Sequence, residues 1–315
     1  MKRIEKMKVV ITERIHRSGI DFLRKNGVDV ELLYETKKSL EDAIKESDGI
    51  VVRLAKITKH LLKIGRENKL KVVAKHGVGV DNIDVEAAKT LGIRVVYTPG
   101  VMSNAVAEFT LGSILLLAKK YLRYDSEVRR GNWGIRYYAD NLEIKGKTLG
   151  IIGYGHIGRR VAELARCFGM NVLVFDPYVK ADNKVRQVDL DTLLKMSDFI
   201  SIHAPLTKET YHMIGRRELE MMKEGVYIIN AARGGIIDEK ALCEAIEKGK
   251  VAGAVLDTTE QEPITLDNPI LRCKNIILTA HTAGITDVSQ VNEALLACKQ
   301  VLQVLRGEEP PYVLV

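Results

Sequence analysis

The feature that most constrains the fold is a glycine-rich turn near the middle of the chain. Residues 150–158 read Gly-Ile-Ile-Gly-Tyr-Gly-His-Ile-Gly. The apolar run 148–152 predicts a buried strand, and apolar residues at helical spacing follow the turn. Glycines at Gly153, Gly155 and Gly158 allow a tight turn and close packing of the helix on the strand. The pattern therefore predicts a strand–turn–helix unit of a parallel α/β sheet.

The same turn predicts a dinucleotide site. Its backbone can approach a pyrophosphate, and the following helix N-terminus offers free N–H groups and a positive dipole end. Asp176 ends the next predicted strand, at the spacing expected of a ribose-binding acid. A carboxylate at this place accepts the ribose hydroxyls and repels a 2′-phosphate, which favours NAD over NADP. Lys180 lies close by, so residual use of NADP stays open.

Strands and helices alternate on both sides of the turn. A chain of 315 residues exceeds one ordinary core, so two domains are expected. Residues 104–130 predict one long helix that could connect them, and apolar residues from Val288 to Leu305 predict a last amphipathic helix. The fold class predicted is α/β, with two Rossmann-like or flavodoxin-like domains built on parallel sheets.

Composition narrows the class of partner. Lysine and arginine number 48 against 41 acidic residues, but the excess is spread in short pairs. Solvated helix faces explain such pairs better than a nucleic-acid site, and the mild positive charge suits a small anionic substrate. The four cysteines lack metal-ligand spacing, and no apolar run is long enough for a signal peptide or a membrane span. We therefore expect a cytoplasmic protein with reduced thiols and no metal, membrane or nucleic-acid partner.

Three polar residues follow predicted strands in the second half. Arg233 follows the strand 226–230, Glu262 lies in a loop fixed by proline, and His281 follows the strand 276–278. In an open α/β sheet such loops line the ligand crevice. A guanidinium suits a carboxylate, and a carboxylate beside a histidine favours the charged imidazole, which can give a proton to a carbonyl oxygen. Each residue alone could equally be an ordinary surface group, so their joint occurrence carries the prediction.

Together these segments resemble the D-isomer-specific 2-hydroxyacid dehydrogenases of the phosphoglycerate dehydrogenase type. The resemblance covers nearly the whole chain and rests on residues 75–84, 106–108, 146–158, 203–207, 230–239, 256–257 with 262–263, and 281–284. It implies that Arg233 orients the substrate, that Glu262 pairs with the histidine, and that His281 donates the proton.

The resemblance also implies the remaining site residues. Those expected to bind NAD are Gly153, Gly155, His156, Ile157, Gly158, Asp176, His203, Ala204, Pro205, Ala231, Asp257 and Gly284. Those expected to bind substrate are Arg53, Lys75, Val78 and Gly79. The glycine-rich loop 77–79 would hold the substrate carboxylate with backbone N–H groups, as an anion-binding nest does.

The resemblance further implies an inserted cofactor domain. Residues 1–103 and 287–315 would form the substrate-binding domain, and residues 104–286 the NAD-binding domain, with the active site in the cleft between them. Members of the family are usually homodimers with the long-helix region in the interface. Some positions depart from the family pattern: Thr258-Thr259, Ala280 and Lys75 stand where Val-Phe, proline and arginine are common. These departures bear on loop geometry and substrate choice.

The substrate is the least constrained part of the prediction. Arg53 resembles a substrate-contacting arginine of the phosphoglycerate enzymes, although Leu54 stands where serine is usual. We predict a D-3-phosphoglycerate dehydrogenase-like activity, with a glyoxylate or hydroxypyruvate reductase as the alternative. A more remote alternative is a non-catalytic NAD-sensing protein like the transcriptional corepressors of this fold. The presence of all three catalytic candidates argues against the sensor, which needs no proton donor.

Overall fold

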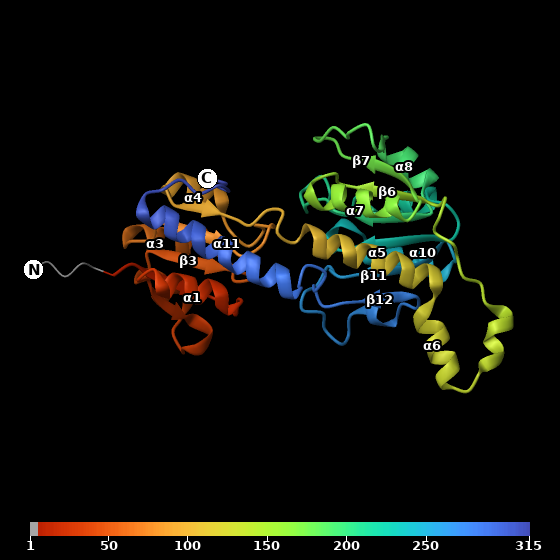
Figure 1. Ribbon diagram of the computed structural model, residues 1–315, viewed down its shortest axis with the longest axis horizontal. Coiled ribbons are helices and arrows are strands. Elements are labelled where there is room, and N and C mark those ends of the chain that lie inside the picture. The colour runs from red at the N-terminus through yellow and green to blue at the C-terminus, as the bar shows by residue number, and fades with distance from the viewer. Residues whose placement is uncertain (1–5) are drawn as a thin grey trace, which may run out of the picture. The chain divides into compact units, whose positions relative to one another are not determined.

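The computed structural model describes residues 6–315, which divide into two compact units (Figure 1). Unit 1 contains the described residues up to Met102 together with Ile285–Val315, and unit 2 is Ser103–Gly284. Unit 2 is therefore continuous in sequence and interrupts unit 1.

Unit 1 is built on a parallel sheet with the strand order β2-β1-β3-β4-β5. Its strands are β1 (Lys8–Ile11), β2 (Asp29–Leu32), β3 (Gly49–Val52), β4 (Val72–Lys75) and β5 (Arg94–Val96). The central strands β1, β3 and β4 are rich in valine and isoleucine and are almost wholly buried. Such runs are typical of strands that are covered on both faces.

Helices supply the two covers of this sheet. They are α1 (Arg17–Lys25), α2 (Leu40–Lys45), α3 (Lys59–Glu67), α4 (Val85–Leu91) and α11 (Asp287–Arg306), with a 3-10 turn η1 (Leu33–Glu35). Successive strand side chains point to opposite faces. Val51 accordingly packs in the apolar cluster shared with α1 and α11, whereas Ile50 and Val52 pack in the cluster shared with α2, α3 and α4.

Unit 2 is built on a second parallel sheet with the order β12-β11-β10-β9-β6-β7-β8. Its strands are β6 (Thr148–Ile152), β7 (Asn171–Phe175), β8 (Arg186–Gln187), β9 (Phe199–Ile202), β10 (Val226–Asn230), β11 (Val251–Leu256) and β12 (Ile276–Leu278). The chain winds outward in both directions from β6, which lies between β7 and β9. Ligands of such sheets bind where the order reverses, at the carboxyl ends of the strands.

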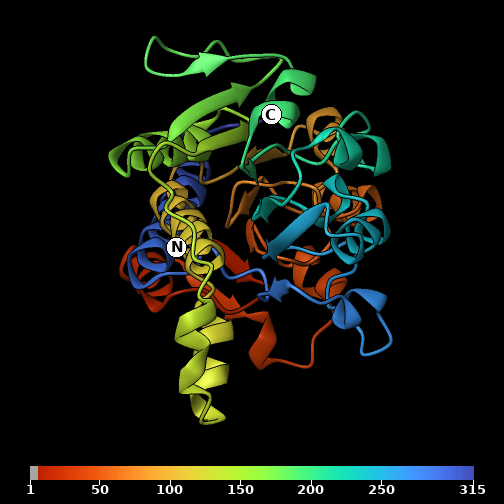
Figure 2. The ribbon, with the colours of Figure 1, turned by 90° about the vertical axis from the view of Figure 1, so that its right-hand side faces the viewer.

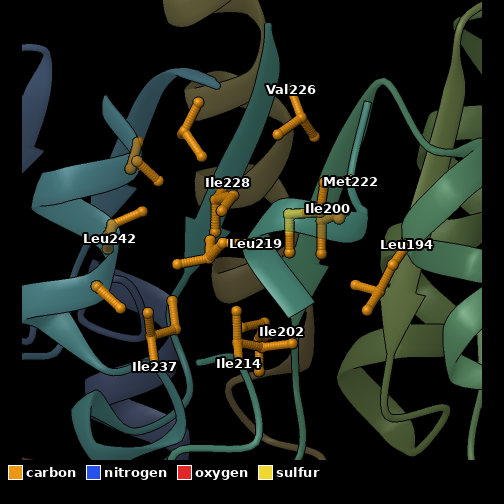
Figure 3. Close-up of a cluster of buried hydrophobic side chains, with 14 of the residues drawn as sticks. Leu194, Ile200, Ile202, Ile214, Leu219, Met222, Val226, Ile228, Ile237 and Leu242 are labelled. Atoms are coloured by element: carbon orange, nitrogen blue, oxygen red, sulfur yellow. The ribbon is translucent and has the colours of Figure 1, made fainter. Parts of the chain in front are cut away.

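Two apolar clusters cover the sheet of unit 2. Its helices are α5 (Ser103–Lys119), α6 (Tyr121–Arg129), α7 (His156–Cys167), α8 (Leu190–Met196), α9 (Arg216–Met221) and α10 (Glu239–Glu247), with 3-10 turns η2 (Trp133–Tyr138), η3 (Gly234–Ile236) and η4 (Pro269–Arg272). Figure 3 shows one cluster, in which Leu219 and Leu242 of the helices meet Ile200 and Ile228 of the strands. The other cluster joins the opposite face to α5 and α7. The predicted α/β class with two parallel sheets is thus confirmed.

The prediction of one continuous helix over residues 104–130 is wrong. Lys120 has φ +50°, which ends α5 and redirects the chain into α6. Helix α5 buries side chains along its length up to Ala118, whereas α6 has no buried residue. The apolar pattern of the sequence continues past Lys120, but α6 does not pack on the sheet, so its apolar side chains are not buried.

No helix among the described residues is long and apolar enough to cross a membrane. No group of three or more histidine, cysteine and acidic side chains among the same residues is arranged to hold a metal ion.

Candidate active site

The glycine turn joins β6 to α7, and each glycine has its own geometric reason. Gly153 has φ +94°, and a Cβ there would lie 2.7 Å from the carbonyl carbon of His203. A Cβ at Gly158 would lie 2.1 Å from the carbonyl oxygen of Gly153, so this glycine lets α7 pack on the turn. A Cβ at Gly155 would meet no atom within 4 Å. Open space thus remains beside the first N–H groups of α7, where His156 and Ile157 begin the helix, and this fits a pyrophosphate.

Asp176 lies beside this turn, directly after β7. One carboxylate oxygen accepts a hydrogen bond from the backbone N–H of Tyr154 at 2.8 Å, and the other accepts those of Tyr178 and Val179, each at 2.9 Å. These donors orient the carboxylate. The oxygen that bonds to Tyr154 accepts only one N–H and keeps a second lone pair, so it can still accept a ribose hydroxyl.

The segment after β9, residues 203–205, packs against the glycine turn at Gly153. His203 donates its backbone N–H to the carbonyl of Ile152 at 2.7 Å, and its Nε2 lies 2.8 Å from the Ser201 hydroxyl. Burial lowers the pKa of His203 to about 3, so the imidazole is neutral. Ala204 and Pro205 continue this segment, and the backbone N of Ala204 would lie 2.8 Å from a Cβ at Gly153. The backbone of His203 thus lies directly against Gly153 of the turn, and its imidazole is buried.

His281 and Glu262 form a hydrogen-bonded pair. His281 Nδ1 lies 2.9 Å from Glu262 Oε2, and Glu262 Oε1 accepts the backbone N–H of Thr259 at 3.2 Å. Burial acts to raise the pKa of Glu262, but the bond to His281 and the charge of Arg233 outweigh it, and the pKa is lowered. Glu262 is therefore ionised and can only accept, so Nδ1 is the donor. The His281 side chain is 47% exposed, which leaves Nε2 accessible.

The loop that carries His281 is shaped by Asp257, which is buried at the end of β11. The Asp257 carboxylate accepts hydrogen bonds from the Thr279 hydroxyl (2.6 Å), the Thr282 N–H (2.7 Å) and the Ala283 N–H (2.9 Å). Its carbonyl accepts the N–H of His281 at 2.8 Å. The resemblance assigned Asp257 to the nicotinamide half of the cofactor. The observed contacts make its carboxylate the anchor of the histidine loop, which ends at Gly284.

Arg233 follows β10, after Ala231 and Ala232. Its Nη1 donates to the carbonyl of Ala232 at 2.7 Å, and Asn230 fixes the backbone by donating to the carbonyl of Arg233 at 2.9 Å. A Cβ at Gly234 would lie 2.0 Å from the carbonyl carbon of Thr259, so the arginine segment and the Glu262 loop are in contact. The three catalytic candidates follow β10, β11 and β12, which are neighbours in the sheet. Unit 2 therefore brings all three together.

A reciprocal contact that sequence reasoning missed holds the Glu262 loop. The Glu239 N–H donates to Glu260 Oε1 at 3.0 Å, and the Glu260 N–H donates to Glu239 Oε1 at 2.6 Å. His212 Nε2 lies 3.2 Å from Glu260 Oε1. We call these two reciprocal hydrogen bonds between Glu239 and Glu260 the glutamate clip. In the sequence, Glu239 resembles a solvated acid at the start of a helix and Glu260 a solvated loop acid, so no local pattern predicts the clip.

The predicted substrate residues belong to unit 1. Lys75 is buried, and its Nζ donates to the carbonyl of Arg53 at 2.5 Å and to Asn82 Oδ1 at 2.6 Å. The Glu13 carboxylate accepts the backbone N–H groups of Arg53 and Leu54, each at 2.9 Å. The lysine that the sequence assigned to substrate thus bonds to the protein itself.

The loop 77–79 directly follows His76 at the end of β4. Gly77 has φ +139°, Val78 is exposed and Gly79 is half-buried. Among the contacts of the described residues, the backbone N–H groups of Val78 and Gly79 have no acceptor within the protein. His76, Thr98 and Glu293, which sequence reasoning did not select, lie beneath this loop.

Comparisons with known proteins agree with this geometry. The family model for the D-isomer specific 2-hydroxyacid dehydrogenase, NAD binding domain, matches residues 111–283. A D-3-phosphoglycerate dehydrogenase of Archaeoglobus fulgidus is 41% identical over 309 residues, which cover 96% of this chain and 58% of that protein. This chain thus spans little more than half of that relative. A glyoxylate reductase of Thermococcus litoralis is 38% identical over 323 residues, covering 97% of this chain and 96% of the reductase.

Solved structures show the same relationship. The crystal structure of a Thermus thermophilus protein superposes with a TM-score of 0.91 at 34% sequence identity, covering 98% of this chain and 100% of that one. The match of the NAD-binding domain covers most of unit 2, where the glycine turn and Asp176 lie, so NAD is the cofactor. The chain belongs to the D-isomer specific 2-hydroxyacid dehydrogenase family.

Proposed function

We propose that the protein is an NAD-dependent dehydrogenase that interconverts a D-2-hydroxy acid and its 2-keto acid. The observation that carries this proposal is the His281–Glu262 hydrogen bond of 2.9 Å beside Arg233, in the unit that also holds the glycine turn. A nicotinamide, when bound, supplies or accepts the hydride. The protein must then supply a proton, orientation and charge.

Each of the three residues has one task in this reaction. During reduction, protonated His281 donates its Nε2 proton to the keto oxygen of the substrate, and during oxidation the neutral imidazole takes that proton back. Glu262 holds Nδ1 and stabilises the imidazolium. Arg233 orients the 2-keto acid through its guanidinium, which also polarises the carbonyl.

Unit 1 is the substrate-binding domain in this proposal. The backbone N–H groups of Val78 and Gly79 bind the substrate carboxylate, which suits a glycine-containing turn without internal acceptors for them. The hydrogen bonds of Arg53 among the described residues are made by its backbone N–H and carbonyl, so its guanidinium is available to a second substrate group. Both features require an anionic substrate.

Two substrates remain candidates, and each has a specific observation in its favour. D-3-phosphoglycerate is favoured by the available Arg53 guanidinium and by the names of the Archaeoglobus and Methanocaldococcus relatives. Glyoxylate or hydroxypyruvate is favoured by Lys75 and by Glu13. The Lys75 ammonium is hydrogen-bonded within the protein, and the Glu13 carboxylate accepts the backbone N–H groups of residues 53–54. Of these donors, only the Arg53 guanidinium is left to bind a phosphate.

A spectrophotometric panel tests the activity. NADH and NADPH would be offered with glyoxylate, hydroxypyruvate, pyruvate and phosphohydroxypyruvate. We expect at least one keto acid to be reduced, with NADH preferred.

We expect His281→Ala to lower kcat by about 10²- to 10⁴-fold, because the proton donor is lost. His60→Ala, at an exposed histidine of unit 1, is the matched control. Near-normal turnover of the His281 variant would show that the proton comes from elsewhere.

Arg53→Ala separates the two substrates. If phosphohydroxypyruvate is the substrate, the variant raises its KM strongly, because the charge partner of the phosphate is gone. If a small acid is the substrate, the KM for glyoxylate changes little.

The protein acts as a cytoplasmic homodimer in this proposal. Its four cysteines are all free thiols, which suits a reducing compartment. Figures 1 and 2 show α6 and the segment after it as an arm that extends from the sheet of unit 2. The arm exposes large apolar side chains at Tyr121, Leu122, Val128, Trp133, Tyr137 and Tyr138. An apolar patch of this kind supports burial against a second copy of the chain.

A further inference from the structure

Unit 1 buries a histidine and a glutamate together. His76 directly follows β4, and Glu293 lies on α11. His76 Nδ1 is 3.3 Å from Glu293 Oε2, and the two side chains are only 4% and 7% exposed. Burying an ionisable pair is costly, so a pair of this kind needs a reason beyond packing. The reaction proposed above gives neither residue a role.

The pair is connected to the loop 77–79 through a hydroxyl. Thr98 Oγ1 accepts the backbone N–H of Gly77 at 2.9 Å and lies 3.2 Å from Glu293 Oε1. The same hydroxyl lies 3.1 Å from the carbonyl of Gly77. Its single proton can go to either oxygen. An ionised Glu293 competes for that proton, whereas a protonated Glu293 leaves it to the loop.

The charges around the pair determine its ionisation. Burial, followed by the positive charge of Arg53, lowers the pKa of His76 to about 4. Burial raises the pKa of Glu293 to about 7, against the opposing effects of Thr98, Arg53 and Lys75. The charge of Lys75 also lowers the pKa of His76, and the charge of Glu13 acts to raise it. His76 is therefore neutral near neutral pH, and the pair changes from uncharged to singly negative as Glu293 loses its proton.

We propose that Glu293, together with His76 and Thr98, is a positioning residue that couples its own protonation to the binding of the substrate carboxylate at the loop 77–79. A Cβ at Gly77 would lie only 3.9 Å from Glu293 Oε1, so an ionised carboxylate adds a negative charge directly beneath the anion site. The substrate binds well while Glu293 is protonated and is repelled once Glu293 is ionised. This inference rests on the proposed function in assigning the substrate carboxylate to this loop.

Steady-state kinetics across pH provide the first test. The KM of the best keto acid would be measured at saturating NADH from about pH 6 to about pH 8.5. In the wild type we expect the KM to rise about fivefold or more, because one charge is added close to the anion. In Glu293→Gln, which keeps the size and removes the charge, we expect a KM that is low and nearly independent of pH.

The kcat of this variant should keep its pH dependence, since His281 and Glu262 are unchanged. Glu308→Gln, at an exposed glutamate after α11, is the matched control. Parallel KM profiles in the wild type and Glu293→Gln would overturn the inference.

A second measurement does not depend on turnover. The ring resonance of His76 would be followed by NMR in protein labelled at its seven histidines, with His76→Gln identifying the signal. It should report the ionisation of Glu293 near neutral pH, and Glu293→Gln should abolish that step. Oxamate, an unreactive analogue of a 2-keto acid, should move the step to higher pH, because an anion that prefers the protonated pair must raise its proton affinity equally. An unchanged midpoint with bound oxamate would overturn the coupling.

The two proposals fail in different ways. If no keto acid is reduced, the proposed activity is wrong, and the titration with oxamate still decides whether an anion at the loop senses Glu293. If turnover and the effect of His281→Ala are as expected but the KM profile of Glu293→Gln matches the wild type, only the coupling is wrong.

Discussion

At the scale of single residues, His281 shows how a side chain is directed by contacts distant in sequence. Its φ of +54° lies in the left-handed region, which costs a non-glycine residue about 1 kcal/mol. The bond from its N–H to the carbonyl of Asp257, and the anchoring of Thr282 and Ala283 by the same aspartate, hold this conformation. The sequence predicts which histidine to choose, but not the turn that aims it at Glu262.

The first prediction at this scale concerns Glu262→Gln. The amide keeps the acceptor for Thr259 but removes the negative charge that favours the imidazolium of His281. In the direction of reduction the protonated histidine is the reactive form. The pH–rate profile of kcat/KM should therefore move to lower pH, with a lower maximum. A pH–rate profile measures this, with the exposed Glu220→Gln as control. An unmoved profile would contradict the pairing.

At the scale of elements, the sequence predicts strands better than helix continuity. The predicted strands 148–152, 226–230 and 276–278 have the observed bounds, because buried parallel strands are short β-branched runs. The helix break at Lys120 was not predicted, because apolar periodicity shows only which face of a helix could be buried. It does not show whether an element is present to bury it.

The glutamate clip is an element-scale feature with its own prediction. Glu239→Ala leaves the Glu260 N–H without its acceptor and loosens the loop that carries Glu262. We expect a loss of about tenfold in kcat/KM and a lower Tm, as for a lost buried hydrogen bond to a charged group. Glu239→Gln keeps an oxygen acceptor for the Glu260 N–H, so this variant should retain most activity. Equal losses in both variants, measured by kinetics and thermal melting, would argue against the clip.

At the scale of the whole molecule, the fold class was predictable and the strand order was not. Each βα unit has a local pattern, but the order of neighbours in the sheet depends on pairings between distant segments. Arg233, Glu262 and His281 could be grouped in advance, since all three follow strands of one parallel sheet. Glu239, His76 and Glu293 could not, because their partners come from other elements.

The proposed dimer is tested at this scale. Light scattering after size-exclusion chromatography should give the wild type twice the chain mass of 35.2 kDa. Replacing Trp133, Tyr137 and Tyr138 with serine removes apolar surface from the arm and should shift the mass to that of one chain. Tyr178→Ser, at an exposed tyrosine outside the arm, should leave the mass unchanged. A dimer that survives the triple replacement would place the interface elsewhere.

The interruption of unit 1 by unit 2 affects the order in which the chain can fold as it leaves the ribosome. Once residue 284 has been synthesised, every strand of unit 2 exists. Unit 1 still lacks α11, whose Ala297 and Val301 complete the apolar cluster around Val9, and the tail in which Leu314 bonds to β5. Domains generally fold as units during synthesis. The core of unit 2 can therefore form first, while one face of the unit 1 sheet is covered by α1 alone until α11 has been synthesised.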